Sequence, residues 1–334
     1  MHMADALIST AVGGAAMAGA LGVTVFSNIK IKNELTREKI PLMGVMGAFV
    51  FAAQMINFTI PGTGSSGHLA GGLLLAAMLG PYAGYLGMFA VLLIQALFFA
   101  DGGLLAFGCN LINMGFFACF VAYPLVFKPI LKKGWNYKRI LLASVISSVV
   151  ALQLGAFSVV METLLSGKAE LPFLPFAALM QPIHLAIGFV EGLVTSAVLF
   201  FVFRSRPEIL EPTLMQAQDK GRSKKLLVVF IVITLVLSAG IFYFASANPD
   251  GLEWSLEKVL SGGELRSDSA GQAAESLQQG TSLFPDYGSE NGTQSYAGVI
   301  GAAFTLVLIA GIALLLRFFG KRSKKGSLKP KPNS

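Results

Sequence analysis

The chain has 334 residues, of which 54% are hydrophobic and only 13% are charged, with 37 glycines in addition. A charged fraction about half that of soluble globular proteins, together with a mean hydropathy of +0.68, excludes a soluble enzyme, a disordered chain and a disulfide scaffold. The net charge of +7 lies in short basic patches between apolar runs, without the motifs or interleaved aromatic residues of a nucleic-acid-binding protein. The sequence therefore predicts an all-α integral membrane protein that does not bind nucleic acid.

The first apolar run, residues 6–27, is expected to remain attached and to cross the membrane, because its basic residues follow the run, whereas a signal peptide carries them before it. The positive-inside rule then places the N-terminus outside. Further apolar runs predict eight more spans, at 41–58, 69–80, 82–100, 104–127, 138–162, 177–203, 225–247 and 297–319. These nine spans leave 22 of the 25 Lys and Arg residues on the cytoplasmic side, which supports this topology.

The segment 69–80 is short for a span, because twelve helical residues rise about 18 Å and the hydrocarbon core is about 30 Å thick. We expect a break at Gly80-Pro81. Either 69–80 is buried among its neighbours or the preceding loop dips into the membrane, and the second alternative is adopted. Cys109 and Cys119 lie ten residues apart in one run, which is about 15 Å along a helix. They are therefore expected to be apolar packing residues and not a disulfide.

The chain divides into a seven-span core, residues 1–206, and a two-span region, residues 207–334. The two C-terminal spans enclose an outside segment, 248–296, with eight acidic and two basic residues and many Gly, Ser and Gln residues, so much of it is expected to be mobile. Small residues at four-residue spacing allow close helix approach, and two such stripes occur, Gly14/Ala18/Gly22 and Gly44/Ala48/Ala52. Internal packing explains either stripe, and the alternative is a docking face for another membrane subunit.

The sequence carries no Walker A pattern, no dinucleotide fingerprint on a strand–helix turn, no HExxH or CxxC motif and no serine triad. We therefore expect no enzymatic activity, and any uphill transport must draw energy from an ion gradient or from another chain. Glu191 is the one acid predicted to lie clearly inside a span. A proton-coupled carrier normally has more acids within the membrane, so this count argues against that class.

Three histidines occur, His2, His68 and His184, and the topology places the first two outside. The amine of Met1, the amide nitrogen of His2 and the Nδ1 of His2 can close two chelate rings around one metal ion. The imidazole of His68 would complete a square of four nitrogens. Square-planar nitrogen sites suit Ni(II) or Cu(II), whereas Zn(II) prefers a tetrahedron and Mg(II) or Ca(II) prefer oxygen. The alternative is that His2 is a polar residue on a frayed terminus.

Other polar residues in the spans could orient these ligands. Asn110 and Asn113 lie three residues apart on one helix face and could point into a shared cavity, while His184 could support a ligand by hydrogen bonding. Hydrogen bonding between helices is the alternative explanation for all three.

The start Met1-His2, the loop Ser66-Gly67-His68-Leu69, the run Phe99-Ala100-Asp101-Gly102-Gly103 and the downstream Asn110 and Asn113 resemble the CbiM/NikM family. These proteins are the substrate-binding (S) components of energy-coupling factor transporters for cobalt and nickel. The similarity covers about residues 1–206, and the sequence from Pro249 to Glu253 looks like the small N component, here fused. The family start often reads Met-His-Ile-Pro-Asp-Gly, so this chain must form the turn after His2 without Pro or Gly.

The resemblance implies a seven-helix core whose extracellular N-terminus is threaded inward, with Met1, His2 and His68 as ligands of transported Ni²⁺ or Co²⁺. Ser66 joins Asn110, Asn113 and His184 as a candidate for orienting them, and loop 59–68 is expected to form part of a lid. The implied partners are a transmembrane coupling protein and cytoplasmic ABC-type ATPases, besides membrane lipid, in a prokaryotic cell membrane. The sequence thus predicts the metal-binding subunit of an ATP-driven importer. The alternatives are a secondary carrier driven by an ion gradient and, third, a metal-responsive sensor.

Overall fold

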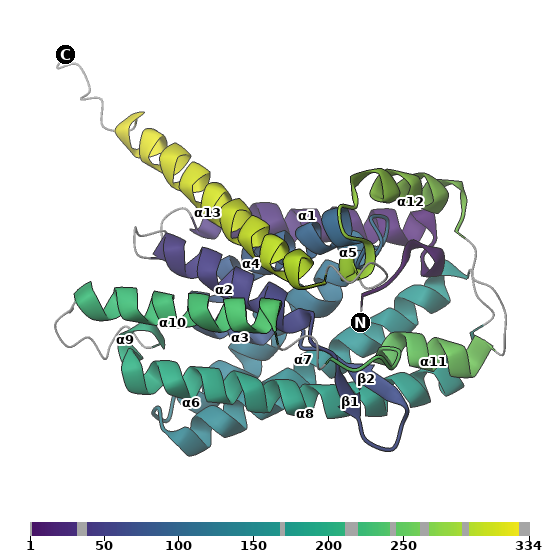
Figure 1. Cartoon of the computed structure of the whole chain (residues 1–334), viewed down its shortest axis with the longest axis horizontal. Helices are drawn as coiled ribbons and strands as arrows, with labels where there is room; N and C mark the ends of the chain where they lie inside the picture. Colours follow the sequence, from purple (N-terminus) through teal and green to yellow (C-terminus); the bar gives the residue numbers. More distant parts are fainter. Residues whose placement is uncertain are drawn as a thin grey trace, which may run out of the picture.

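The computed structural model describes residues 2–31, 39–167, 171–210, 220–240, 245–260, 267–288 and 294–326 (Figure 1). The described chain is mostly helical, with one two-stranded antiparallel hairpin. The elements up to residue 210 are η1 (Asp5–Leu7), α1 (Thr10–Ile31), α2 (Lys39–Gln54), β1 (Phe58–Ile60), β2 (Ser65–Gly67), α3 (Gly72–Leu79), α4 (Pro81–Ile94), η2 (Gln95–Phe99), α5 (Phe107–Leu111), η3 (Ile112–Phe127), α6 (Lys128–Leu131), α7 (Tyr137–Ser166), α8 (Phe173–Ser205) and α9 (Pro207–Leu210). The remaining elements are α10 (Lys220–Ala239), α11 (Gly251–Leu260), α12 (Ser269–Thr281), η6 (Pro285–Gly288) and α13 (Gln294–Gly326).

Six helices in the described ranges are long and apolar enough to cross a membrane, so the chain is a multi-pass membrane protein. They cover Thr10–Ile31, Pro81–Phe99, Phe107–Leu131, Tyr137–Ser166, Phe173–Ser205 and Tyr296–Phe318. Two further apolar helices, Lys39–Gln54 and Lys225–Ala239, are shorter. The nine-span count and the outside N-terminus stay predictions.

The break expected at Gly80-Pro81 is present. Gly80 has φ 87° and closes α3, while Pro81 opens α4, where its fixed φ fits the first helical turn. The helix α3 is eight residues long and every one of its residues is buried. Its length of about 12 Å is less than the thickness of the hydrocarbon core, and its complete burial agrees with the first of the two alternatives.

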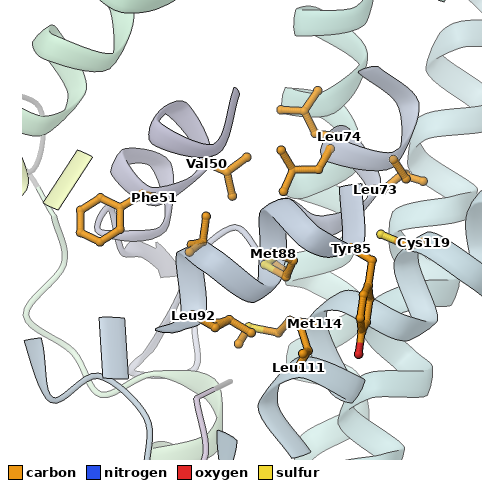
Figure 2. Packing of buried hydrophobic residues seen from close by; sticks show 14 of the residues in the cluster. Val50, Phe51, Leu73, Leu74, Tyr85, Met88, Leu92, Leu111, Met114 and Cys119 are labelled. Atoms are coloured by element: carbon orange, nitrogen blue, oxygen red, sulfur yellow. The ribbon is translucent and has the colours of Figure 1, made fainter. Parts of the chain in front are cut away.

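The core is centred on α2, α3, α4 and the α5–η3 helix (Figure 2), where Tyr85 lies beside Cys119 and Leu111. A Cβ at Gly72 would lie 2.3 Å from the carbonyl oxygen of Met114, so glycine allows α3 to rest directly on the backbone of η3. Both cysteines are buried and free, as expected from their spacing.

The C-terminal helices pack on the α2 stripe of small residues. A Cβ at Gly44 would lie 3.2 Å from the carbonyl oxygen of Leu306 in α13, and Ala48 lines an apolar cavity of about 150 Å³ together with residues of α10 and α13. Internal packing therefore explains this stripe. On α1, by contrast, nothing lies within 4 Å of a Cβ built at Gly14 or Gly22.

The described parts of the acidic segment contact the core, and the expectation that much of it is mobile stays a prediction. The backbone N–H of Ser66 donates to the carbonyl of Pro249 (2.8 Å), and the side chain of Gln278 donates to the carbonyls of Ala96 (2.8 Å) and Gly102 (2.7 Å). The composition is polar, but α11 is amphipathic and buries Leu252 and Leu256. In Figure 1 this segment, with α11 and α12, lies at the same end of the molecule as the N-terminus.

Candidate metal-binding site

The N-terminal segment is held in the core by hydrogen bonds between the backbone of Met3 and the side chain of Asn110. The N–H of Met3 donates to Oδ1 of Asn110 (2.7 Å), and Nδ2 of Asn110 donates back to the carbonyl of Met3 (3.1 Å). The same carbonyl accepts the N–H of Gly103 (2.8 Å), and the side chain of Met3 is fully buried. Residue 3 is therefore fixed on both of its backbone groups, and His2 is placed next to it.

The turn after His2 is made by Asp5, without Pro or Gly. Asp5 opens the short helix η1, and its Oδ1 accepts the N–H of Ala106 (2.9 Å). A Cβ at Gly103 would collide with this carboxylate, so Gly103 leaves the space that Asp5 occupies. Burial raises the pKa of Asp5, and the backbone hydrogen bond from Ala106 opposes the rise.

His2 and His68 come together at the end of this segment. Their rings are stacked, with centroids 5.0 Å apart and planes inclined by 15°. The two side chains are only 7% and 8% exposed. Burial lowers the pKa of both imidazoles to about 3, so both rings are neutral near pH 7, which is the form that binds metal.

Each imidazole lies beside a carboxylate that was not assigned a role from the sequence. Nδ1 of His2 is 3.0 Å from Oδ1 of Asp101, and Nε2 of His68 is 3.9 Å from Oδ2 of Asp250. Tyr287 donates to Asp101 and accepts a hydrogen bond from Gln95 (3.1 Å). Asp250 and Tyr287 come from the acidic segment, so the C-terminal region lies beside His68 through Asp250 and is linked to His2 through Tyr287 and Asp101.

The position of His68 is set by the β1–β2 hairpin and by two side chains from the helices. Glu191 accepts hydrogen bonds from the N–H groups of Ala70 (2.7 Å) and Gly71 (3.3 Å), and Gln54 donates to the carbonyl of Ala70 (2.7 Å). Nδ1 of His68 lies 3.2 Å from the carbonyl of Leu69. This contact favours a proton on Nδ1, which puts the metal-binding lone pair on Nε2.

The residues predicted to orient the ligands have different partners. Asn110 holds the segment that carries His2. Asn113 donates to Glu162 (2.8 Å) and lies 3.6 Å from the sulfur of Met3. Glu162 is buried four residues before the end of α7 at Ser166, and the apolar helix continues past the predicted end of the span at residue 162. Glu191 is therefore not the one acid inside a candidate span.

Ser66 and His184 lie near His68, and each is hydrogen-bonded to a backbone carbonyl. The hydroxyl of Ser66 donates to the carbonyl of Asn248 (2.8 Å), so Ser66 joins the hairpin to the C-terminal region. Nδ1 of His184 is 2.8 Å from the carbonyl of Met180. His184 also lines a small cavity of about 10 Å³ with His68 and Asp250, which is close to the space that one water needs.

The histidine, cysteine and acidic side chains of the described residues do not complete a metal site by themselves. Met1 lies outside the described residues, and among those that are described no group of three or more His, Cys, Asp or Glu residues is arranged to hold a metal ion. Two neutral imidazoles suit a nickel or cobalt ion, and the sequence predicts that backbone and terminal nitrogen atoms supply the remaining donors.

The chain is similar in sequence and in structure to known metal transport proteins. The family model described as "Cobalt uptake substrate-specific transmembrane region" matches residues 2–209, and that of the "PDGLE domain" matches residues 224–318. A protein of Archaeoglobus fulgidus whose name describes a fused nickel transport protein, NikMN, is 30% identical over 317 residues, which cover 94% of this chain and 98% of that protein. The cobalt transport protein CbiM of Geobacter sulfurreducens is 26% identical over 275 residues, 78% of each chain. The solved structure of a truncated transition metal transporter superposes with a TM-score of 0.54 at 30% identity, covering 61% of this chain and 99% of that one.

Proposed function

The chain belongs to the CbiM family of cobalt uptake substrate-specific transmembrane regions, a nickel and cobalt transport family, and carries a fused PDGLE domain; from this premise we propose that it is the substrate-binding subunit of an ATP-driven importer. In this proposal it binds one Ni²⁺ or Co²⁺ ion at the outer face of the cell membrane. The single observation that carries the proposal is the pairing of His2 with His68, two buried and neutral imidazoles with ring centroids 5.0 Å apart.

The proposed ligands are the amine of Met1, the amide nitrogen and Nδ1 of His2, and Nε2 of His68. The contact between Nδ1 of His2 and Asp101 bears on how the ion is bound. Nδ1 of His2 and Oδ1 of Asp101 are 3.0 Å apart, a distance that a hydrogen bond spans. If Nδ1 carries the proton of this bond, a metal ion can bind there only after the proton has moved to the other ring nitrogen or to solvent. The carboxylate of Asp101 would then remain beside a bound cation and partly balance its charge.

We further propose that energy comes from other chains, a transmembrane coupling protein and cytoplasmic ABC-type ATPases. The sequence has no Walker A pattern. The described spans bury two acids, Glu162 and Glu191. Glu162 accepts a hydrogen bond from Asn113, and Glu191 accepts hydrogen bonds from the backbone of Ala70 and Gly71. These contacts hold helices and a loop in place. These contacts favour an importer subunit over an ion-coupled secondary carrier.

Uptake of radioactive nickel by cells that express the chain with and without its partner proteins tests the proposal. We expect uptake to require the coupling protein and the ATPases, while the isolated chain with its native N-terminus binds nickel without them. Equal uptake when the partners are absent and the membrane potential is kept would identify a secondary carrier. Absence of nickel and cobalt binding by the isolated native chain would contradict the proposed function altogether.

A further inference from the structure

A second feature lies beside the paired histidines: a cavity of about 220 Å³ that opens next to His2. Its lining comes from both halves of the chain. The core contributes His2 and two acids, and the C-terminal region contributes four more; the six acids are Asp5, Asp101, Asp250, Glu253, Glu275 and Asp286. No Lys or Arg is among its described lining residues, so the cavity has one sign of charge.

Two buried polar atoms of residues that line this cavity have no hydrogen-bond partner in the described part of the chain. They are Oδ2 of Asp5, a residue that is 2% exposed, and Nε2 of His2. A buried carboxylate oxygen without a partner is destabilising. A cation, or a water molecule held by a cation, is the group that would satisfy a carboxylate oxygen and a neutral imidazole nitrogen together.

The cavity has room for a cation that keeps its waters. A cavity needs about 10–15 Å³ of this volume to hold one water, so an ion with its complete inner hydration shell fits into about 220 Å³. The described acids do not converge into a cage of three or more ligands. An ion in this cavity would therefore meet the carboxylates through its waters, which would give weak binding and little selectivity among divalent metals.

From this geometry we propose that the cavity is an antechamber, a second site that holds a hydrated divalent cation before the ion loses its waters at His2 and His68. This inference rests on the proposed function and adds a role for the acidic segment, four of whose acids line the antechamber. A cleft lined by one sign of charge concentrates counter-ions and raises association rates by about 10- to 1000-fold in a salt-dependent way. The antechamber should accordingly determine how fast nickel is loaded and have little effect on how tightly it is finally held.

Three isosteric substitutions remove charge from the antechamber and spare the proposed ligands: Glu253→Gln, Glu275→Gln and Asp286→Asn. Glutamine keeps an oxygen that can accept the N–H of Asp250 and the hydroxyl of Ser267, which Glu253 and Glu275 now accept. Asp286 has φ 46°, and asparagine adopts this left-handed conformation readily. Glu257→Gln, one turn beyond Glu253 on α11 and absent from the lining, is the matched control.

The experiment uses the full-length chain with its native N-terminus. Stopped-flow measurement of nickel loading should show a rate at least about tenfold lower for the triple variant at low salt, with a weaker salt dependence and an equilibrium nickel affinity within about twofold of the wild type. Titration with Mn²⁺, which prefers oxygen ligands, followed by electron paramagnetic resonance, should reveal a weak site, with a dissociation constant of about 10⁻⁴–10⁻³ M. The triple variant should lose this site, and Glu257→Gln and His68→Ala should retain it.

The outcomes separate the two proposals. A wild-type chain that fails to bind nickel contradicts the proposed function. A wild-type chain that binds nickel tightly, with a triple variant that loads at the same rate or keeps the Mn²⁺ signal, overturns the antechamber alone. The retained equilibrium affinity for nickel shows that the triple variant is folded, and Glu253→Gln compared with Glu257→Gln repeats the test with a single charge on one helix.

Discussion

The side chain of Asn110 does for Met3 what a neighbouring β-strand would do: it accepts the residue's N–H and donates to its carbonyl. One amide in the α5 helix thereby fixes the backbone direction of the segment that ends in His2. This pairing turns an N-terminus that would fray in water into a placed element of the site.

Replacing Asn110 with Ala should therefore weaken nickel binding by about 5- to 150-fold, because two buried hydrogen bonds, each worth about 0.5–1.5 kcal/mol, no longer hold Met3. Isothermal titration with nickel measures the change. Asn113→Ala is the control, since Asn113 contacts the sulfur of Met3 and Glu162 but neither backbone group of Met3. Equal losses in the two variants would argue against a specific role for the Asn110 pairing.

Placing Gly–Ser before Met1 should weaken nickel binding about as much as His2→Ala does, because the free amine becomes an ordinary amide and the chelate must shift or lose a ring. His68→Ala should also lower the affinity, by removing the fourth nitrogen. A C-terminal tag is the control and should have no effect. Isothermal titration decides, and equal affinities for the native and the extended chain would disprove the N-terminal chelate.

Asp5→Asn should stabilise the metal-free protein at pH 7. Burial raises the folded-state pKa of Asp5 above its ordinary value of 3.8, so the folded state favours the protonated carboxyl, and stability is lost as the pH rises through the folded pKa. Below pH 3.8 both states are protonated and the difference disappears. Thermal melts at pH 7 and pH 4 should show an advantage for Asp5→Asn that shrinks at the lower pH; an advantage independent of pH would show that ionisation of Asp5 is not its cause.

Two glycine-to-alanine changes on helices should differ in sign. At Gly72 the added Cβ would lie 2.3 Å from the carbonyl oxygen of Met114, whereas at Gly22 nothing lies within 4 Å. Gly72→Ala should destabilise the protein by about 1–3 kcal/mol through overpacking. Gly22→Ala should be neutral or should stabilise it by up to about 1 kcal/mol, because alanine favours helix. Thermal melts in one detergent compare them, and similar melting temperatures would contradict the close packing of α3 on η3.

Sequence reasoning paired the two histidines, which the structure brings together, because few histidines occur and both lie in segments predicted to be outside. It also found the break at Gly80-Pro81, since proline at the start of a helix and glycine before it act locally. These features depend on neighbours in sequence and can be read from it.

Asp101 and Asp250 were quoted in sequence motifs but given no role, because their partners, His2 and His68, lie 99 and 182 residues away in the chain. Such contacts follow from tertiary packing, which a single sequence does not specify. The same holds for the stripe on α2: its spacing indicated close packing, but only the fold identifies α13 as the helix that packs on it. The polar composition of the acidic segment did not indicate its contacts with the core, because α11 concentrates its few apolar residues on one face.

The bond from Ser66 to Pro249 joins the hairpin that carries His68 to a region that is part of the same polypeptide. An intramolecular contact of this kind has an effective local concentration set by the connecting chain. A separate subunit would contact the hairpin only to the extent that it is expressed and bound. In the fused chain, dilution in the membrane cannot separate the C-terminal region from the hairpin, and every copy that is synthesised contains one of each.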